Sequence, residues 1–133
     1  MKGIKEREEQ LKGIKNEQDI SRFISRIEAD SDAEEEEAFW DERKRTLLRA
    51  VIMYLLETRA GPISFGMILD LLREYPVIYG DTENTPLDGI FLRHMRRHPE
   101  SRAVREYVKF HAFGRRTKFT TAICLIGIME KYE

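Results

Sequence analysis

The longest helical pattern in the chain is FWDERKRTLLRAVIMYLLET, residues 39–58. Its large apolar side chains recur at the spacing of one α-helical face: Trp40, Leu47, Leu48, Val51, Tyr54 and Leu55. Gly61 and Pro62 follow, and such a pair is typical of a helix end. At about 1.5 Å per residue the helix would be about 30 Å long, the width of a small domain. We therefore expect residues 39–58 to form the central helix of the fold.

Shorter helical patterns lie on both sides of this central one. Before it, four apolar residues share a helical face behind Asp19, the expected N-cap: Ile20, Phe23, Ile24 and Ile27. After it, four patterns follow that are bounded by polar caps, Pro or Gly: residues 64–75, 85–97, 99–113 and 117–133. No useful length alternates apolar and polar residues with period two, as a half-buried strand would. We therefore predict an all-α fold, a compact single-domain bundle of about six helices.

Two features of these boundaries are specific enough to test. Ser64 and Thr85 can each accept a backbone N–H bond at the start of a helix, and Asp88 places a carboxylate in the first turn after Pro86. Gly114 is the expected C-cap of the helix that ends near residue 113.

The start of the chain is weaker in pattern than the rest. Residues 1–16 carry only Ile4, Leu11 and Ile14 as large apolar side chains besides Met1, so we expect a flexible or loosely helical segment there. Residues 17–133 hold the stronger patterns and form the predicted helical bundle. A chain of 133 residues has room for a single core of common domain size.

Composition narrows the class of protein. The chain is 41% apolar and 35% charged, and its one cysteine, Cys124, lies in an apolar stretch. We read Cys124 as a buried thiol, which suits a reducing compartment. The longest apolar run, residues 122–129, is far shorter than the roughly 18 residues of a membrane span. We therefore expect a cytoplasmic location and no direct membrane insertion by this chain.

Charge is unevenly distributed along the sequence. Residues 1–42 hold fourteen acidic and seven basic side chains, a net of −7, whereas residues 91–118 hold nine basic and two acidic ones, a net of +7. Guanidinium groups pair with phosphates or carboxylates in a forked geometry, so nucleic acid and acidic protein both fit. The candidate DNA- or cargo-binding residues are Arg93, Arg96, Arg97, Arg102, Arg105, Arg115, Arg116 and Lys118. An ordinary solvated face is the competing interpretation.

The acidic run offers a second candidate surface. A basic protein partner could dock on Glu34, Glu35, Glu36 and Glu37. A solvated linker is the favoured reading of this run, because like charges repel one another and have nothing to bury. Trp40, next to it, could be a binding hot spot, but its place at the head of an apolar stripe favours core packing.

Nothing in the sequence indicates catalysis, a cofactor or a metal. His94 and His98 have the i, i+4 spacing of a helical zinc pair, but Met95 stands where a zinc protease has its Glu, and no third ligand is evident. No recognisable motif pairs Cys124 or Ser101 with a base. The chain also lacks the Gly-x-x-x-x-Gly-Lys-Ser/Thr loop that cradles nucleotide phosphates. We therefore predict a chain that is not an enzyme.

Three groups of residues have an order and spacing that can be compared with a known family: Phe39-Trp40 with Leu47-Leu48-Arg49-Ala50 and Tyr54-Leu55; Pro86-Leu87-Asp88 with Phe91; and Val104, Tyr107 and Phe110 before a Thr-rich final helix at Thr117. On these groups, residues 19–133 resemble the all-alpha domain of type IV secretion coupling proteins, and most closely the Gram-positive type. These coupling proteins are hexameric ATPases that hand conjugative DNA to a secretion channel.

The resemblance implies a substrate-recognition domain, excised from an ATPase at the cytoplasmic face of the cell membrane. Its expected partners are the relaxase or another relaxosome protein, single- or double-stranded DNA, and the parent ATPase domain, which could itself cover the basic face. The alternative is a stand-alone helical DNA-binding regulator in which residues 99–113 enter a groove. A helix-turn-helix usually has Gly in its turn, and His98-Pro99 offers none.

Overall fold

The computed structural model describes residues 3–30, 40–59, 61–75 and 85–133. Within these residues the chain forms one domain of α-helices without a strand, so the predicted all-α single-domain fold is confirmed. The described chain has seven helices rather than about six, because residues 1–16 contribute one. They are α1 (Ile4–Lys12), α2 (Glu17–Asp30), α3 (Glu42–Thr58), α4 (Phe65–Leu72), α5 (Pro86–Arg97), α6 (Arg102–His111) and α7 (Arg115–Glu130).

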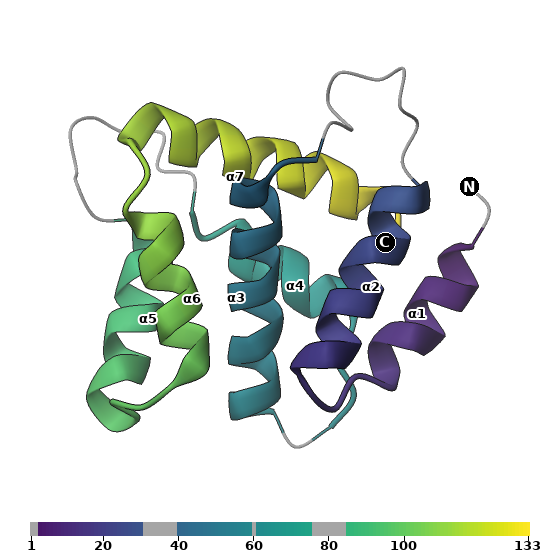
Figure 1. Ribbon diagram of the computed structural model, residues 1–133, viewed down its shortest axis with the longest axis horizontal. Helices are drawn as coiled ribbons and strands as arrows, with labels where there is room; N and C mark the ends of the chain where they lie inside the picture. The colour runs from purple at the N-terminus through teal and green to yellow at the C-terminus, as the bar shows by residue number, and fades with distance from the viewer. Residues whose placement is uncertain (1–2, 31–39, 60, 76–84) are drawn as a thin grey trace.

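The helices are arranged around α3 (Figure 1). Figure 1 shows α5 and α6 on one side of α3, α1 and α2 on the other, and α7 across one end. Helix α4 packs against both α3 and α7. The expected central position of residues 39–58 is therefore correct, although α3 begins only at Glu42.

Burial on several sides explains the position of α3. At most 4% of the residue surface is exposed at six positions in the middle of this helix, Leu47, Leu48 and residues 50–53. The buried residues therefore cover several sides of the helix instead of one stripe. A helix that is apolar nearly all round must lie among its neighbours. Aromatic pairs complete the core at both sides of α3: Phe23 contacts Phe65, and Tyr54 contacts Phe91.

The predicted helix starts at Ser64 and Thr85 are confirmed. Ser64 accepts a hydrogen bond from Met67 N at 3.2 Å. Thr85 and Asp88 form a capping box, in which each side chain accepts the backbone N–H of the other residue. Such a box satisfies two amide donors that a helix start leaves without partners.

Two expected boundaries are different in the structure. Helix α2 begins at Glu17, and its cap is Asn16, whose side chain accepts from Asp19 N at 2.9 Å. Asp19 lies in the first turn instead, where its carboxylate accepts from Lys15 N. Gly114 is the N-cap of α7 rather than the C-cap of α6, which ends at His111.

The N-terminal segment packs more firmly than its composition suggests. Leu11 is 1% exposed and Ile14 is 6% exposed, so both lie in the core. Arg7 Nε lies 2.7 Å from Asp30 Oδ2, and Tyr132 donates its hydroxyl to the same carboxylate oxygen at 3.0 Å. The chain therefore holds α1 against α2 and the C-terminal residues, where we expected a flexible or loosely attached segment.

Helix α7 is apolar on more than one side, as expected, but one side is open to solvent. Leu125 and Met129 are fully buried, whereas Phe119 is 44% and Ile123 is 45% exposed. Cys124 is partly exposed, so the expectation of a buried thiol is wrong. Among the described residues, no helix has both the length and the apolar character needed to cross a membrane.

Candidate recognition site

Most of the predicted basic residues lie on or next to the pair α5 and α6. The two helices run side by side in opposite directions and are joined by residues 98–101 (Figure 1). The rings of Phe91 and Tyr107 stack between them with centroids 4.0 Å apart. Stacking at midlength fixes the spacing of the pair.

A buried carboxylate fixes the end of the pair where α5 begins. Tyr107 donates its hydroxyl to Asp88 Oδ1 at 2.5 Å, and Thr85 N donates to Asp88 Oδ2 at 2.8 Å. Burial, and next the hydrogen bond to Asp88, raise the pKa of Tyr107 well above its ordinary value. The phenol therefore stays a hydrogen-bond donor throughout the physiological range.

A second carboxylate fixes the other end of the pair to α3. Glu57 Oε1 accepts from His94 Nε2 at 2.7 Å and from Ser101 Oγ at 2.5 Å, and Glu57 Oε2 accepts from Ala103 N at 3.1 Å. Burial acts to raise the pKa of Glu57, but these hydrogen bonds outweigh it and the pKa falls below its ordinary 4.5. Glu57 thus ties together α3, α5 and the start of α6.

A polar cleft of about 690 Å³ lies beside this junction. It is bordered by α3, α4 and α5, and its positively charged lining residues are Arg59, Arg93 and Arg97. Three carboxylates line it as well: Glu57 of α3, Asp70 of α4 and Glu74, which follows the end of α4. Arg93 and Arg97 are exposed and stand one helical turn apart, so both guanidinium groups are available to a ligand.

The other predicted arginines of the pair lie outside the cleft. Arg96 and Arg105 are exposed on α5 and α6 and are not among the residues that line it. Arg102 Nη1 lies 2.5 Å from Glu17 Oε2 of α2, and both side chains are solvent-exposed. An exposed ion pair is worth only about 0–1 kcal/mol, so a ligand could displace Glu17 at small cost.

The remaining basic candidates lie at the opposite end of α6. Arg115 and Arg116 are exposed in the first turn of α7. Lys118 is only 7% exposed, so it is not part of an open basic surface. Because α6 is ten residues long, about 15 Å separate the two ends. The structure divides the basic set instead of gathering it into one face.

Three further predictions concern the acidic run, Trp40 and His94. Glu34, Glu35, Glu36 and Glu37 lie outside the described residues. Trp40 is partly buried and packs against the core, in agreement with the favoured interpretation. His94 is buried against Glu57.

Sequence reasoning missed Glu57 and Arg59. They follow the apolar pattern of α3, and Glu57 meets partners 37 to 46 positions away. Among the partners of Glu57, Ser101 carries a local signal, because Ser is a favoured N-cap residue, and its Oγ accepts a hydrogen bond from Val104 N.

Comparison of the chain with protein-family models, with curated proteins and with solved structures finds no match.

Proposed function

We propose that this chain is the non-catalytic cargo-recognition domain of a type IV coupling protein. Its parent would be a conjugative ATPase at the cytoplasmic face of the membrane. The cargo would be the relaxase or another relaxosome protein, with DNA as a second ligand. The observation that carries the proposal is the pair of exposed arginines, Arg93 and Arg97, beside the cleft at the junction of α3, α4 and α5.

The support for this role is a pair of exposed arginines on a rigid base. Glu57 anchors the turn between α5 and α6 through three hydrogen bonds, so the backbone that carries Arg97 is fixed before any ligand arrives. A rigid surface loses less entropy on binding. The planar guanidinium groups of Arg93 and Arg97 favour carboxylates or phosphates on the ligand.

The arrangement of α5 and α6 disfavours the alternative of a stand-alone DNA-binding regulator. A helix-turn-helix places its two helices at about 90–120°, so that the second can enter the major groove. Here α6 runs antiparallel to α5, and buries Tyr107 against it and Glu106 against Arg49 of α3. The exposed part of α6 is therefore flanked by its neighbours.

A binding measurement with charge-reversed variants tests the proposal. The double variant Arg93→Glu/Arg97→Glu is compared with Arg22→Glu/Arg26→Glu, which makes the same charge change on the exposed side of α2. The ligands are the relaxase encoded beside the parent gene and labelled single- and double-stranded DNA, across a salt series. We expect salt-sensitive relaxase binding that the first variant weakens by about tenfold or more and the second leaves unchanged.

Two results would overturn the proposal. One is the absence of binding to the relaxase and to both forms of DNA even at low salt. The other is an equal loss in the two double variants, which would mean that only net charge matters. Tight binding to one double-stranded sequence, without relaxase binding, would instead favour the regulator.

A further inference from the structure

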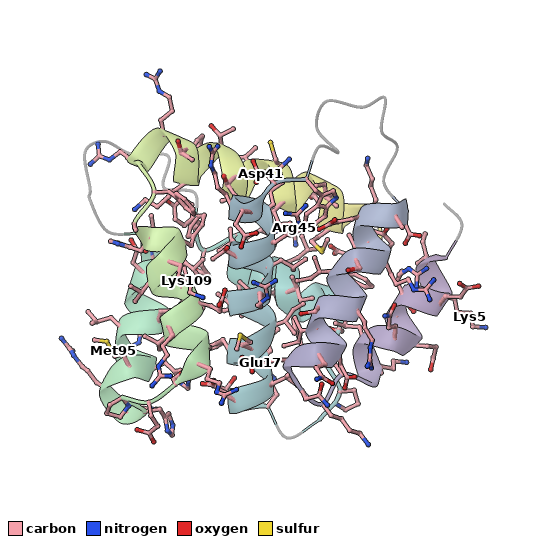
Figure 2. All side chains as sticks on the ribbon, in the orientation of Figure 1. Lys5, Glu17, Asp41, Arg45, Met95 and Lys109 are labelled. Atoms are coloured by element: carbon pink, nitrogen blue, oxygen red, sulfur yellow. The ribbon has the colours of Figure 1, made fainter. Side chains whose placement is uncertain are left out.

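The pair α5 and α6 carries a second depression, which the basic residues do not explain. It is an apolar groove of about 380 Å³ between α5 and α6, and no residue of α3 lines it. Leu92 and Met95 from α5 and Val104 and Val108 from α6 form its walls. In Figure 2, Met95 lies at the outer edge of the molecule.

The walls of this groove are unusually exposed for apolar side chains. Leu92 is 44%, Met95 38% and Val108 58% exposed, and they are three of the five most exposed large apolar residues in the described chain. Single exposed apolar residues are common on protein surfaces, but a contiguous set around a depression marks an interaction surface. Phe91 and Tyr107, whose rings stack on one another, also line the groove, and the Tyr107 hydroxyl is fixed by its hydrogen bond to Asp88.

The dimensions of the groove suit a helix. Its lining residues on α5 extend from Asp88 to Met95, which is a length of about 10 Å or two helical turns. A third helix laid between two antiparallel helices buries one apolar face and completes a small bundle. Apolar residues of the occupant at i, i+3 or i+4, and i+7 would meet the groove.

The charges around the groove select among such helices. Arg96 follows Met95 on α5, and Arg105 follows Val104 on α6, and both are exposed. His111 lines the groove and is 47% exposed in its side chain. Among the lining residues the one carboxylate is Asp88, which is 9% exposed and is engaged by Tyr107. The exposed charge beside the groove therefore comes from Arg96 and Arg105 and is cationic, and a partner with acidic borders complements it.

We propose that this groove binds an acidic amphipathic α-helix of the protein cargo, with its apolar face in the groove and its carboxylates toward Arg96 and Arg105. The inference rests on the proposed function in taking the helix to belong to the cargo. Nucleic acid is the less suitable occupant, because aliphatic walls offer no partner to a phosphate backbone.

A peptide assay on the whole chain tests the groove itself. The probe is a fluorescein-labelled synthetic helix with leucines at i, i+3, i+4 and i+7 and glutamates elsewhere. Its controls are the same composition scrambled, and the same pattern with lysine in place of glutamate. We expect the acidic amphipathic peptide alone to bind, and Val108→Glu to weaken it by about tenfold or more. Ile123→Glu on α7, a change of similar exposure and chemistry, should leave binding unchanged.

Each other outcome has a definite meaning. The proposal that the groove binds an acidic helix is overturned if the scrambled or the lysine peptide binds equally well. It is also overturned if Val108→Glu binds the acidic peptide as tightly as the unmodified chain does. Binding of single-stranded DNA that displaces the peptide and is weakened by Val108→Glu overturns it in favour of nucleic acid.

The relaxase separates the groove from the proposed function. If Val108→Glu leaves relaxase binding intact and Arg93→Glu/Arg97→Glu abolishes it, the groove is not the relaxase site, but the proposed function stands. If the peptide binds and the relaxase does not, the groove is a site for a helix, but the relaxase is not its partner.

Discussion

Tyr107 is the residue on which the pair α5 and α6 depends most directly. Its ring stacks on Phe91, and its hydroxyl donates to the buried Asp88. Tyr107→Phe keeps the stacking and leaves the carboxylate without that donor, so we expect the free energy of unfolding to fall by about 1–3 kcal/mol. Urea unfolding measures the difference. Tyr54→Phe is the matched control, because in the described part of the structure its hydroxyl makes no hydrogen bond; an equal loss there would contradict the assignment.

Glu57 makes stability depend on pH in a predictable direction. Its pKa is below the ordinary 4.5 in the folded state, so the unfolded chain binds a proton more readily there. The contribution of Glu57 is therefore complete above about pH 4.5 and is lost as the pH falls through the folded pKa. We expect Glu57→Gln to flatten the loss of stability in this acidic window.

Unfolding by urea at a series of acidic pH values measures this slope. Glu74→Gln, two residues after the end of α4, is a control on an exposed carboxylate. If the slope with Glu57→Gln equals that of the unmodified chain, Glu57 does not have the depressed pKa that we assign to it.

Helical spacing in the sequence identified some site residues and could not identify others. Arg93 and Arg97 stand one turn apart, and that spacing alone places them on the same side of α5. The pairing of Arg102 with Glu17 joins positions 85 apart, and no local pattern carries such information. Lys118 shows the same limit, since a lysine can bury its long apolar stem and so lie inside a basic stretch without being exposed.

Among the helices, α1 is the one whose packing differs most from what its few apolar residues led us to expect. Leu11 is 1% exposed, so Leu11→Ala removes buried methyl groups and leaves a cavity. We expect the free energy of unfolding to fall by about 2–5 kcal/mol. Ile4→Ala, at a partly buried position of the same helix, should cost less. Denaturant unfolding compares the two, and a loss below about 1 kcal/mol for Leu11→Ala would restore the view of α1 as loosely attached.

The helices also show which elements a sequence can reveal. The central α3 and the capped starts at Ser64 and Thr85 were predictable, because apolar periodicity and capping are local. Helix α1 was not, because three apolar residues are too few to specify packing by themselves. The tertiary ion pair of Arg7 with Asp30 supplies the missing contact, and it becomes visible only once α2 is in place.

For the molecule as a whole, the open side of α7 is the main risk to solution behaviour. Phe119 and Ile123 stand one turn apart and are nearly half exposed. We expect weak association of the purified chain at high concentration, because such a stripe remains in contact with water in the monomer. Sedimentation over a concentration series should detect it, and Phe119→Gln/Ile123→Gln should reduce it. A monomer at every concentration would show that the stripe is too small to drive association.

Asp30 gives the molecule a mechanical property. Arg7 near one end of the chain and Tyr132 near the other both bind its carboxylate. Tension applied between the two ends therefore loads this carboxylate, together with the ion pairs of Arg73 with Glu130 and Glu133, before it reaches α3. In an optical trap we expect α1 and the last residues to detach together at low force while the rest stays folded, and Asp30→Ala to abolish that first step. A motor protein that pulls at these ends would then unfold α1 and the last residues at low force, while the pair α5 and α6 stays folded.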